Sequence, residues 1–448
     1  MIVMKFGGSS IATAEKIRRV AGLVKSEIPR RPVVVVSAHG KTTDALIHAG
    51  RKALLGKVDT IEIERVHHTL IDELGLDRRL VDGLLNQLSM LLHGIRLIGE
   101  LTPRTLDQVM SFGERMSVLV MSAAFAAEGI RAVPMNAFDI GLATDAGHGS
   151  ATPLPGIYDG IASHLLEADG VPVVTGFLGM DPKGSITTLG RSGSDWSASI
   201  LGAAVAALEV QIWSDVNGVM TCDPSIDPKA RNIPALSFEE ASELAYFGAE
   251  VLHPHTLAPA IEKGIPVRVL NTLCPSDPGT RITAQSVLTS RIAKSVAYKE
   301  DVCLIHIESP RIVTAAVLLG RASAILAEHK VGIHMAATSE ASVSLVTDRP
   351  YDEEELERPL SEIRKLGRTT VERRKAILCV VGEELRGLPD AASRIFGAVA
   401  SKGIQPRMAA LSGSRINVAF LIDDVEIEPA VSSLHDLLLS SPGHGQKG

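Results

Sequence analysis

Residues 32–40, PVVVVSAHG, decide the fold of the first half of the chain. Four consecutive valines without alternating polar residues are typical of a strand that is buried on both faces of a parallel sheet. The run ends in a serine and a glycine, where the chain can turn. The same design, an apolar run followed by glycine, occurs at 2–8 (IVMKFGG) and 171–179 (VPVVTGFLG). These stretches predict parallel strands that end at one edge of a sheet.

Helical patterns alternate with the strand signals. Ser9 and Ser10 are N-cap candidates for a first helix, which carries Ile17 and Val20 on one face. Further strands are expected at 210–219 and 265–272, the latter as the last of the series, and further helices at about 43–55, 60–74, 78–98, 105–128, 194–208 and 238–248. Such alternation predicts a layered α/β domain with an open, mostly parallel sheet.

The composition changes near 273–300, where a turn-rich stretch is expected to lead out of the first domain. Beyond it, two segments repeat a β-α-β-β-α order that is ferredoxin-like. The predicted domains are therefore 1–290, 300–372 and 373–448. Neither of the last two contains an evident nucleophile and base, so both are interpreted as regulatory or dimerising units.

The composition of the 448 residues excludes several classes of protein. A net charge of −7 and an aromatic content of 3% argue against nucleic-acid binding. The four cysteines form no CxxC pair, which favours a reducing compartment and predicts no metal site. We find no signal peptide and no apolar run long enough to span a membrane. A cytoplasmic protein is expected.

Three strand ends carry glycine and small hydroxylated residues, in 5–8, 37–43 and 190–195. Ligands of open α/β sheets bind beyond the carboxyl ends of the strands, and glycine there lets backbone N–H groups approach phosphate oxygens. Lys5 and Arg191 add positive charge, and no GxxxxGK[ST] sequence is present. The pattern predicts phosphate chemistry without a P-loop.

These stretches resemble a known family. In order along the chain they are KFGGSS (5–10), VVVSAHGKTTD (34–44), SFGERMS (111–117), TTLGRSGSDWSA (187–198), IWSDVNGVMTCDP (212–224) and FGAEVLHPHT (247–256). The order and spacing are similar to those of aspartate kinases, in the amino-acid kinase superfamily. The resemblance covers about residues 1–290, and the paired tail resembles the ACT domains of that family. It implies an amino-acid kinase fold, a three-layer αβα arrangement, followed by two ACT units.

The resemblance implies transfer of the ATP γ-phosphoryl group to the side-chain carboxylate of L-aspartate. That carboxylate is already ionised at neutral pH, so the reaction needs no general base. Lys5 would contact the phosphates and stabilise the transferring group, and Gly7, Gly8 and Ser9 would shape the phosphate loop. Ser214 and Asp215 would lie near the adenosine, and Mg²⁺ would arrive with ATP.

The resemblance also implies the contacts to aspartate. Arg191 would bind its α-carboxylate as a bidentate fork, and Glu114 its ammonium. Ser37 and Thr43 would hydrogen-bond the substrate. Ser194 and Asp195 would line the reaction centre, where Asp195 could hold either Lys5 or the substrate ammonium.

Several positions depart from the family pattern. Ser192 replaces a glycine in GRGGSD and adds strain if that position needs a positive φ. Met220, Ser225 and Glu250 replace the usual tyrosine, arginine and lysine of the nucleotide segment, and we assign them no contact to ATP.

In the tail, Thr338, Ser339 and Glu340 match an effector motif of the family, but the facing stretch at 312–320 is apolar. We therefore hypothesise weak or absent feedback inhibition by lysine or threonine; the alternative is an effector pocket with altered contacts.

Two alternative functions remain open at the level of sequence. One is another amino-acid kinase of the same fold, which the SFGERMS and GRSGSD stretches disfavour. The other is a non-catalytic amino-acid sensor, and the retention of Lys5, Glu114, Arg191 and Asp195 argues against it. Because ACT units usually pair across subunits, a homodimer is expected. No membrane partner is expected.

Overall fold

The computed structural model describes residues 1–248, 254–309, 314–348 and 353–439. The chain forms two compact units. The first contains 1–219, 232–242 and 250–287, and the second contains 220–231, 243–249 and 288–448. Two short segments from within the predicted 1–290 domain therefore belong to the second unit.

An eight-stranded sheet forms the centre of the first unit, in the order β3-β4-β2-β1-β7-β9-β10-β8. Its strands are β1 (Ile2–Phe6), β2 (Pro32–Val36), β3 (Ala132–Met135), β4 (Val171–Thr175), β7 (Val210–Ser214), β8 (Ala235–Ser237), β9 (Val267–Asn271) and β10 (Thr280–Thr283). The first six strands in this order run parallel, and β10 is antiparallel to β9. Every residue of β2 is buried, as the valine run predicts. A separate hairpin joins β5 (Leu178–Met180) and β6 (Ile186–Thr188).

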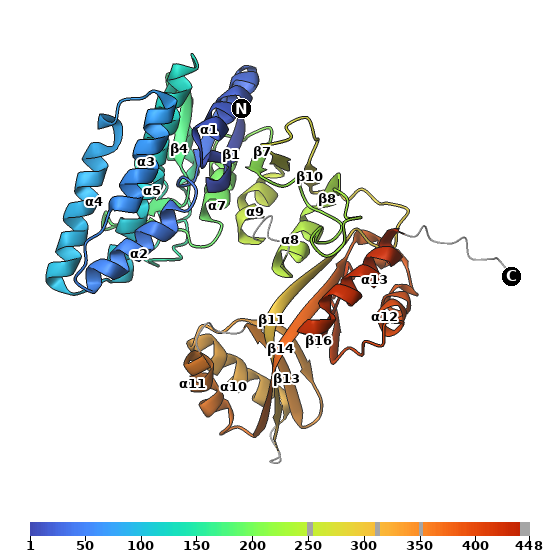
Figure 1. Cartoon of the computed structure of the whole chain (residues 1–448). Helices are drawn as coiled ribbons and strands as arrows, with labels where there is room; N and C mark the ends of the chain where they lie inside the picture. Colours follow the sequence, from blue (N-terminus) through green and yellow to red (C-terminus); the bar gives the residue numbers. More distant parts are fainter. Residues whose placement is uncertain (249–253, 310–313, 349–352, 440–448) are drawn as a thin grey trace. The chain divides into compact units, whose positions relative to one another are not determined.

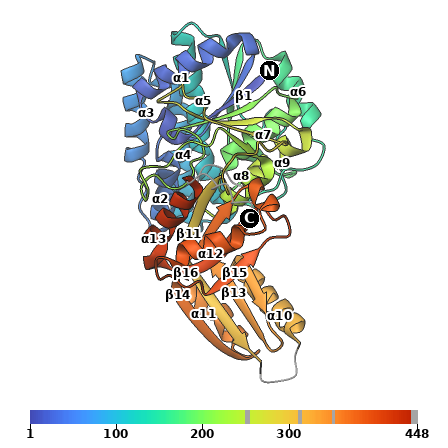
Figure 2. The ribbon, with the colours of Figure 1, turned by 90° about the vertical axis from the view of Figure 1, so that its right-hand side faces the viewer.

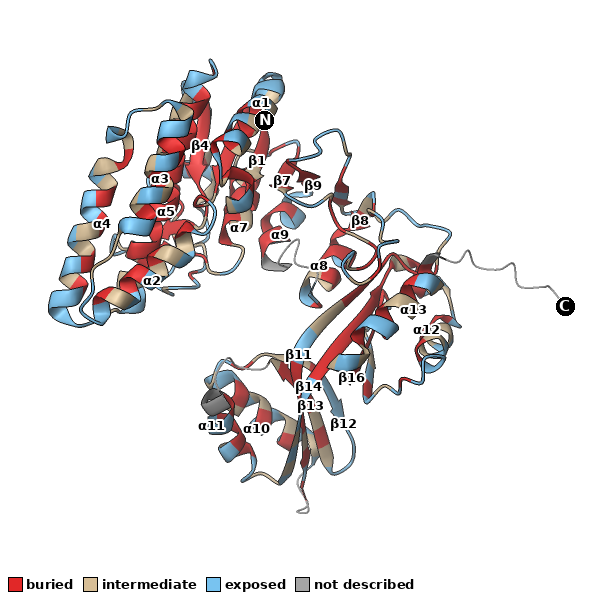
Figure 3. Cartoon of the chain, viewed as in Figure 1, coloured by how far each residue is buried: buried red, intermediate tan, exposed pale blue. Residues whose placement is uncertain are grey.

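Helices cover both faces of this sheet, so the predicted three-layer α/β class is confirmed (Figures 1 and 2). One face carries α1 (Ala14–Glu27), α2 (Thr42–Leu54), α3 (Ile61–Leu74), α4 (Arg79–Ile98) and α5 (Pro103–Ala127). The other carries α6 (Tyr158–Glu167), α7 (Gly193–Ala204) and α9 (Pro254–Lys263). In length and hydropathy α5 would qualify as a membrane span, but 78% of its most apolar window is buried within the fold, as its colouring in Figure 3 shows.

Two local predictions for this unit are wrong. The N-cap of α1 is Thr13, whose side chain accepts a hydrogen bond from the Lys16 amide, while Ser9 and Ser10 lie in a preceding 3₁₀ turn. The strand at 265–272 is not the last, because β10 follows it and carries β8 as its outer neighbour. Both added strands are too short for alternation to be read from their sequence.

A six-stranded antiparallel sheet forms the second unit, in the order β12-β13-β11-β14-β16-β15. Its strands are β11 (Ser295–Glu308), β12 (Ile333–Thr338), β13 (Ser342–Asp348), β14 (Arg368–Val381), β15 (Met408–Leu411) and β16 (Asn417–Asp423). Its helices are α10 (Ala315–Glu328), α11 (Glu353–Ile363), α12 (Ala391–Ala400) and α13 (Ile427–Leu439), and α8 (Phe238–Tyr246) bridges the chain segments of both units. Separate cores under α10–α11 and α12–α13 fit the predicted pair of β-α-β-β-α repeats.

Candidate active site

Two glycine-containing loops lie against each other at the carboxyl ends of β1 and β2. The Gly40 amide donates a hydrogen bond to the Gly8 carbonyl over 3.0 Å. A Cβ atom on Gly8 would lie only 2.7 Å from the Ala38 oxygen and 2.9 Å from the Gly40 oxygen. Only glycine therefore fits at position 8, and bare backbone lines this part of the sheet edge.

Lys5 and Asp195 form the charged centre of the site. Lys5 is on β1 and Asp195 is in the first turn of α7, and their Nζ and Oδ1 atoms are 2.6 Å apart. Both side chains are 12% exposed, so the pair is largely shielded from solvent but still reachable. Beside them the Ser37 hydroxyl donates to the Ser194 hydroxyl over 3.0 Å. The structure thus brings together four of the predicted site residues from three separate stretches of sequence.

The Glu114 carboxyl group lies beside the carboxyl end of β2, near Ala38. It lies on α5 and is 3% exposed, and its Oε1 atom accepts a hydrogen bond from the Ala38 amide over 3.1 Å. Its Oε2 atom is buried and has no hydrogen-bond partner among the described residues. Burial raises the pKa of this carboxyl to about 8. A buried carboxylate with one free oxygen is well suited to bind a cationic group.

The loop between β6 and α7 presents Arg191 to solvent. No described residue forms a hydrogen bond or ion pair with its guanidinium, which leaves the guanidinium available to an anion. Gly190 and Ser192, on either side, have positive φ values of 77° and 55°. The position that is usually glycine in this family does require a left-handed backbone, so Ser192 holds strain that glycine would not.

The other predicted residues are less tightly placed. Thr43 is half-buried in the first turn of α2, and Ser9 is exposed in the 3₁₀ turn beyond Gly8. Ser214 ends β7 and Asp215 follows it, and β7 pairs in parallel with β1 through Phe6 and Trp213. They therefore lie at the same sheet edge as Gly7.

Two of the departures in the nucleotide segment lie outside this unit. Met220 and Ser225 belong to the second compact unit, where Ser225 bonds Asp223, and Glu250 lies outside the described residues. In the second unit Thr338 ends β12, and the Ser339 hydroxyl is 2.7 Å from that of Ser342. Glu340 is exposed.

Within the described ranges, one group of side chains has the spacing of a metal site: Cys222, Asp227 and His435, all buried in the second unit. The His435 imidazole is already bonded on both sides, to Asp227 through Nδ1 over 2.7 Å and to Thr221 through Nε2 over 2.8 Å. Burial raises the pKa of the Cys222 thiol to about 12, so it is not a ready thiolate ligand. The group acts as a hydrogen-bonded anchor for α13.

Sequence reasoning missed Asp107, a fully buried carboxylate on α5. It accepts hydrogen bonds from Thr188 in β6 and from His148 and Gly149 in the loop before α6. The signal in the sequence is its spacing: Asp107 precedes Glu114 by seven residues, two helical turns, and so lies on the same face of α5.

Comparison with known proteins identifies the class. The amino acid kinase family profile matches residues 1–271, and an ACT domain profile matches residues 378–438. The chain therefore belongs to the amino acid kinase family.

Within that family, the similarity is to aspartokinases along nearly the whole chain. Aspartokinase 1, chloroplastic, of Arabidopsis thaliana is 37% identical over 98% of this chain and 80% of its own length. Among solved structures, E. coli aspartokinase III in complex with aspartate and ADP (R-state) has a TM-score of 0.85 at 29% identity, over 98% of this chain and 100% of that one. The complex of the same protein with lysine and aspartate (T-state) has a TM-score of 0.79 over the same shares, also at 29% identity. The predicted membership of the aspartokinases is confirmed.

Proposed function

We propose that the chain transfers the γ-phosphoryl group of ATP to the side-chain carboxylate of L-aspartate, giving 4-phospho-L-aspartate and ADP. The observation that carries this is the set of polar groups at one sheet edge: the Lys5–Asp195 pair, the half-satisfied carboxyl of Glu114, and Arg191, which has no partner in the part of the chain that the structure describes. The cations Lys5 and Arg191, with Asp195 holding Lys5 and Glu114 able to ionise against an ammonium, match an amino acid with two carboxylates that must meet a polyphosphate.

In this mechanism Arg191 binds the α-carboxylate of aspartate and Glu114 binds its ammonium. The side-chain carboxylate is then held toward the glycine loops, where ATP phosphates accept hydrogen bonds from backbone N–H groups. One carboxylate oxygen attacks the γ-phosphorus, and the bond from phosphorus to the β,γ-bridging oxygen breaks as ADP leaves. No proton has to move in the transfer step itself, since the attacking carboxylate is ionised.

Lys5 stabilises the negative charge of the transferring phosphoryl group, and Asp195 holds the Lys5 ammonium in place over 2.6 Å. Ser37 and Ser194 bond each other and can exchange that bond for one to the substrate. Mg²⁺ travelling with ATP would neutralise phosphate charge. The described residues at this sheet edge offer it no converging set of ligands, so we assign it no protein ligand.

The test is trapping of the acyl phosphate with hydroxylamine. The purified protein is incubated with Mg-ATP and, separately, with aspartate, glutamate or N-acetylglutamate, with Arg191→Ala as the matched control. Hydroxamate from aspartate only, and its loss in the control, is the expected result. Hydroxamate from glutamate instead supports another amino-acid kinase, and nucleotide binding without any hydroxamate supports a non-catalytic sensor.

Assembly, regulation and location are further parts of the proposal. Pairing through the ACT units would give a homodimer, which light scattering tests by mass. We propose weak or absent feedback inhibition by lysine or threonine, because the described residues at 314–320, which by resemblance would lie opposite the Thr338–Glu340 motif, are mostly apolar. Inhibition at low concentrations of either amino acid would contradict this. A cytoplasmic location is supported by four free cysteines.

A further inference from the structure

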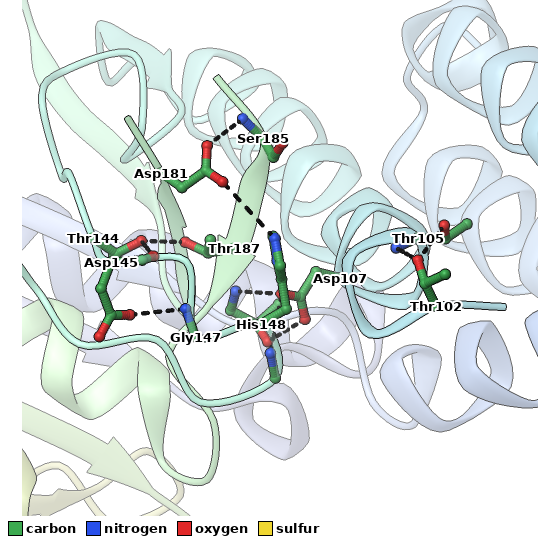
Figure 4. Close-up of polar contacts among 12 residues, drawn as sticks. Thr102, Thr105, Asp107, Thr144, Asp145, Gly147, His148, Asp181, Ser185 and Thr187 are labelled. Atoms are coloured by element: carbon green, nitrogen blue, oxygen red, sulfur yellow. Dashed lines mark hydrogen bonds and ion pairs between the residues drawn. The ribbon is translucent and has the colours of Figure 1, made fainter. Parts of the chain in front are cut away.

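Asp107 is the centre of a buried network that no step of the mechanism uses. Its Oδ1 atom accepts from the Thr188 hydroxyl over 2.7 Å. Its Oδ2 atom accepts from His148 Nδ1 over 2.9 Å, the Gly149 amide over 3.1 Å and the Thr188 amide over 3.3 Å. Figure 4 shows Asp107 and His148 facing each other beneath the β5–β6 hairpin.

The network joins three elements that are distant in sequence. Asp107 is on α5, Thr188 ends β6, and His148 and Gly149 belong to the loop before α6. A fully buried carboxylate is costly unless its oxygens are hydrogen-bonded. Because these donors satisfy it, the hairpin end and the loop are both fixed relative to α5.

Arg191 lies close in sequence to Thr188, a member of this network. Thr188 precedes it by three residues, and the Thr188 carbonyl accepts a further bond from the Ala151 amide over 2.9 Å. The backbone of Gly149 packs against Gly190: a Cβ atom added to Gly190 would lie 3.2 Å from the Gly149 carbonyl oxygen. The loop that carries Arg191 therefore rests on residues held by Asp107.

We propose that Asp107, together with His148, is a positioning residue for Arg191. Helix α5 carries Glu114 two turns beyond Asp107 on the same face, so it fixes both the ammonium-binding carboxylate and the support of the loop that binds the α-carboxylate. The network thereby sets the distance between Glu114, which binds the ammonium of an α-amino acid, and Arg191, which binds its α-carboxylate. This inference rests on the proposed function.

The test compares Thr188→Val with Thr188→Ser, and adds Asp107→Asn. Valine keeps the shape of threonine and removes one donor to Asp107, whereas serine keeps the donor. Thr188→Val and Asp107→Asn are expected to raise KM for aspartate roughly tenfold, with KM for ATP within about twofold of wild type. Thr188→Ser restores the wild-type values. Ser111→Ala, which removes a local bond to Gln108 on the same helix, is the control and leaves both KM values unchanged.

Unfolding midpoints are measured for every variant. A purely structural role would lower the midpoint and the amount of active enzyme while leaving both KM values alone, and that result overturns the inference. Equal changes in the two KM values also overturn it. If Asp107→Asn does not fold, the comparison of Thr188→Val with Thr188→Ser decides. Wild-type protein that forms no aspartyl hydroxamate refutes the proposed function itself, a result distinct from either of these.

Discussion

In the first unit Glu114 is buried and one of its carboxyl oxygens has no partner among the described residues, whereas in the second unit the buried imidazole of His435 is bonded on both sides. The first unit also leaves Arg191 without a partner among the described residues, while the second pairs Asp348 with both His334 and Lys299. Polar groups at the kinase sheet edge are thus left for a ligand to satisfy. In the second unit the His435 and Asp348 side chains are bonded to neighbouring residues and hold elements together.

The largest expected effect in this comparison comes from Lys5→Met. Removing the ammonium takes away the charge that stabilises the transferring phosphoryl group and leaves Asp195 without its partner. We expect kcat to fall about a thousandfold. Steady-state kinetics measures it, with Lys57→Met, an exposed lysine, as the control. A fall of less than about tenfold would remove Lys5 from the reaction centre.

Glu114→Gln should separate function from stability. The amide keeps an acceptor for the Ala38 N–H group but loses the charge for the substrate ammonium, so KM for aspartate should rise about a hundredfold. Burial raises the pKa of Glu114 from 4.5 to about 8, so the wild type loses stability as pH rises through that window.

The variant should therefore have a higher unfolding midpoint than the wild type at pH 8, and this gain should shrink at pH 5. Thermal unfolding at the two pH values measures it. A variant that is less stable than the wild type at pH 8 would show that the carboxylate is satisfied in the folded protein.

His435→Phe should lower the stability of the protein without changing its affinity for the substrate. It removes the bonds to Asp227 and Thr221 that anchor α13 to the segment at 220–231. The unfolding midpoint is expected to fall by about 4 °C, with KM for aspartate unchanged at temperatures where the variant is folded. Calorimetry and kinetics on one preparation check both. A large change in KM for aspartate without a change in the unfolding midpoint would show that His435 serves substrate binding and not stability, contrary to the difference drawn between the two units.

The smallest expected effect is that of Ser192→Gly. Glycine relieves the strain of a φ of 55° without touching a charged group. We expect stability to rise by roughly 0.5–1 kcal/mol, with kcat within about twofold of wild type. Denaturant unfolding measures the gain, and a loss of stability would mean that the serine side chain makes a compensating contact.

The sequence was most informative where burial on both sides forces a pattern. The valines of β2 and the helices at 42–54 and 79–98 lie within one residue or a few of their predicted places. It was least informative for β8 and β10, two short strands at the end of the sheet order, and for α11, a charged helix with Pro359 inside it. The strands β11 and β14 run much longer than predicted because each serves both repeats.

The same limit applies to the site. The motifs named Lys5, Glu114, Arg191 and Asp195, and the structure brings Lys5 to Asp195. Asp107 could not be chosen from the sequence, because an aspartate in a helix is usually solvated and only tertiary contacts show its burial. Its seven-residue spacing from Glu114 was the available signal.

The most direct test of the contrast is to count the protons released when aspartate binds. Aspartate is titrated calorimetrically into protein saturated with Mg-ADP at pH 7, in buffers of different ionisation enthalpy. The Glu114 carboxyl, with a pKa near 8, is mostly protonated before binding and must ionise to bind an ammonium, so the account predicts release of close to one proton, lost in Glu114→Gln. Binding without proton release in the wild type would show that Glu114 does not ionise to bind the substrate ammonium.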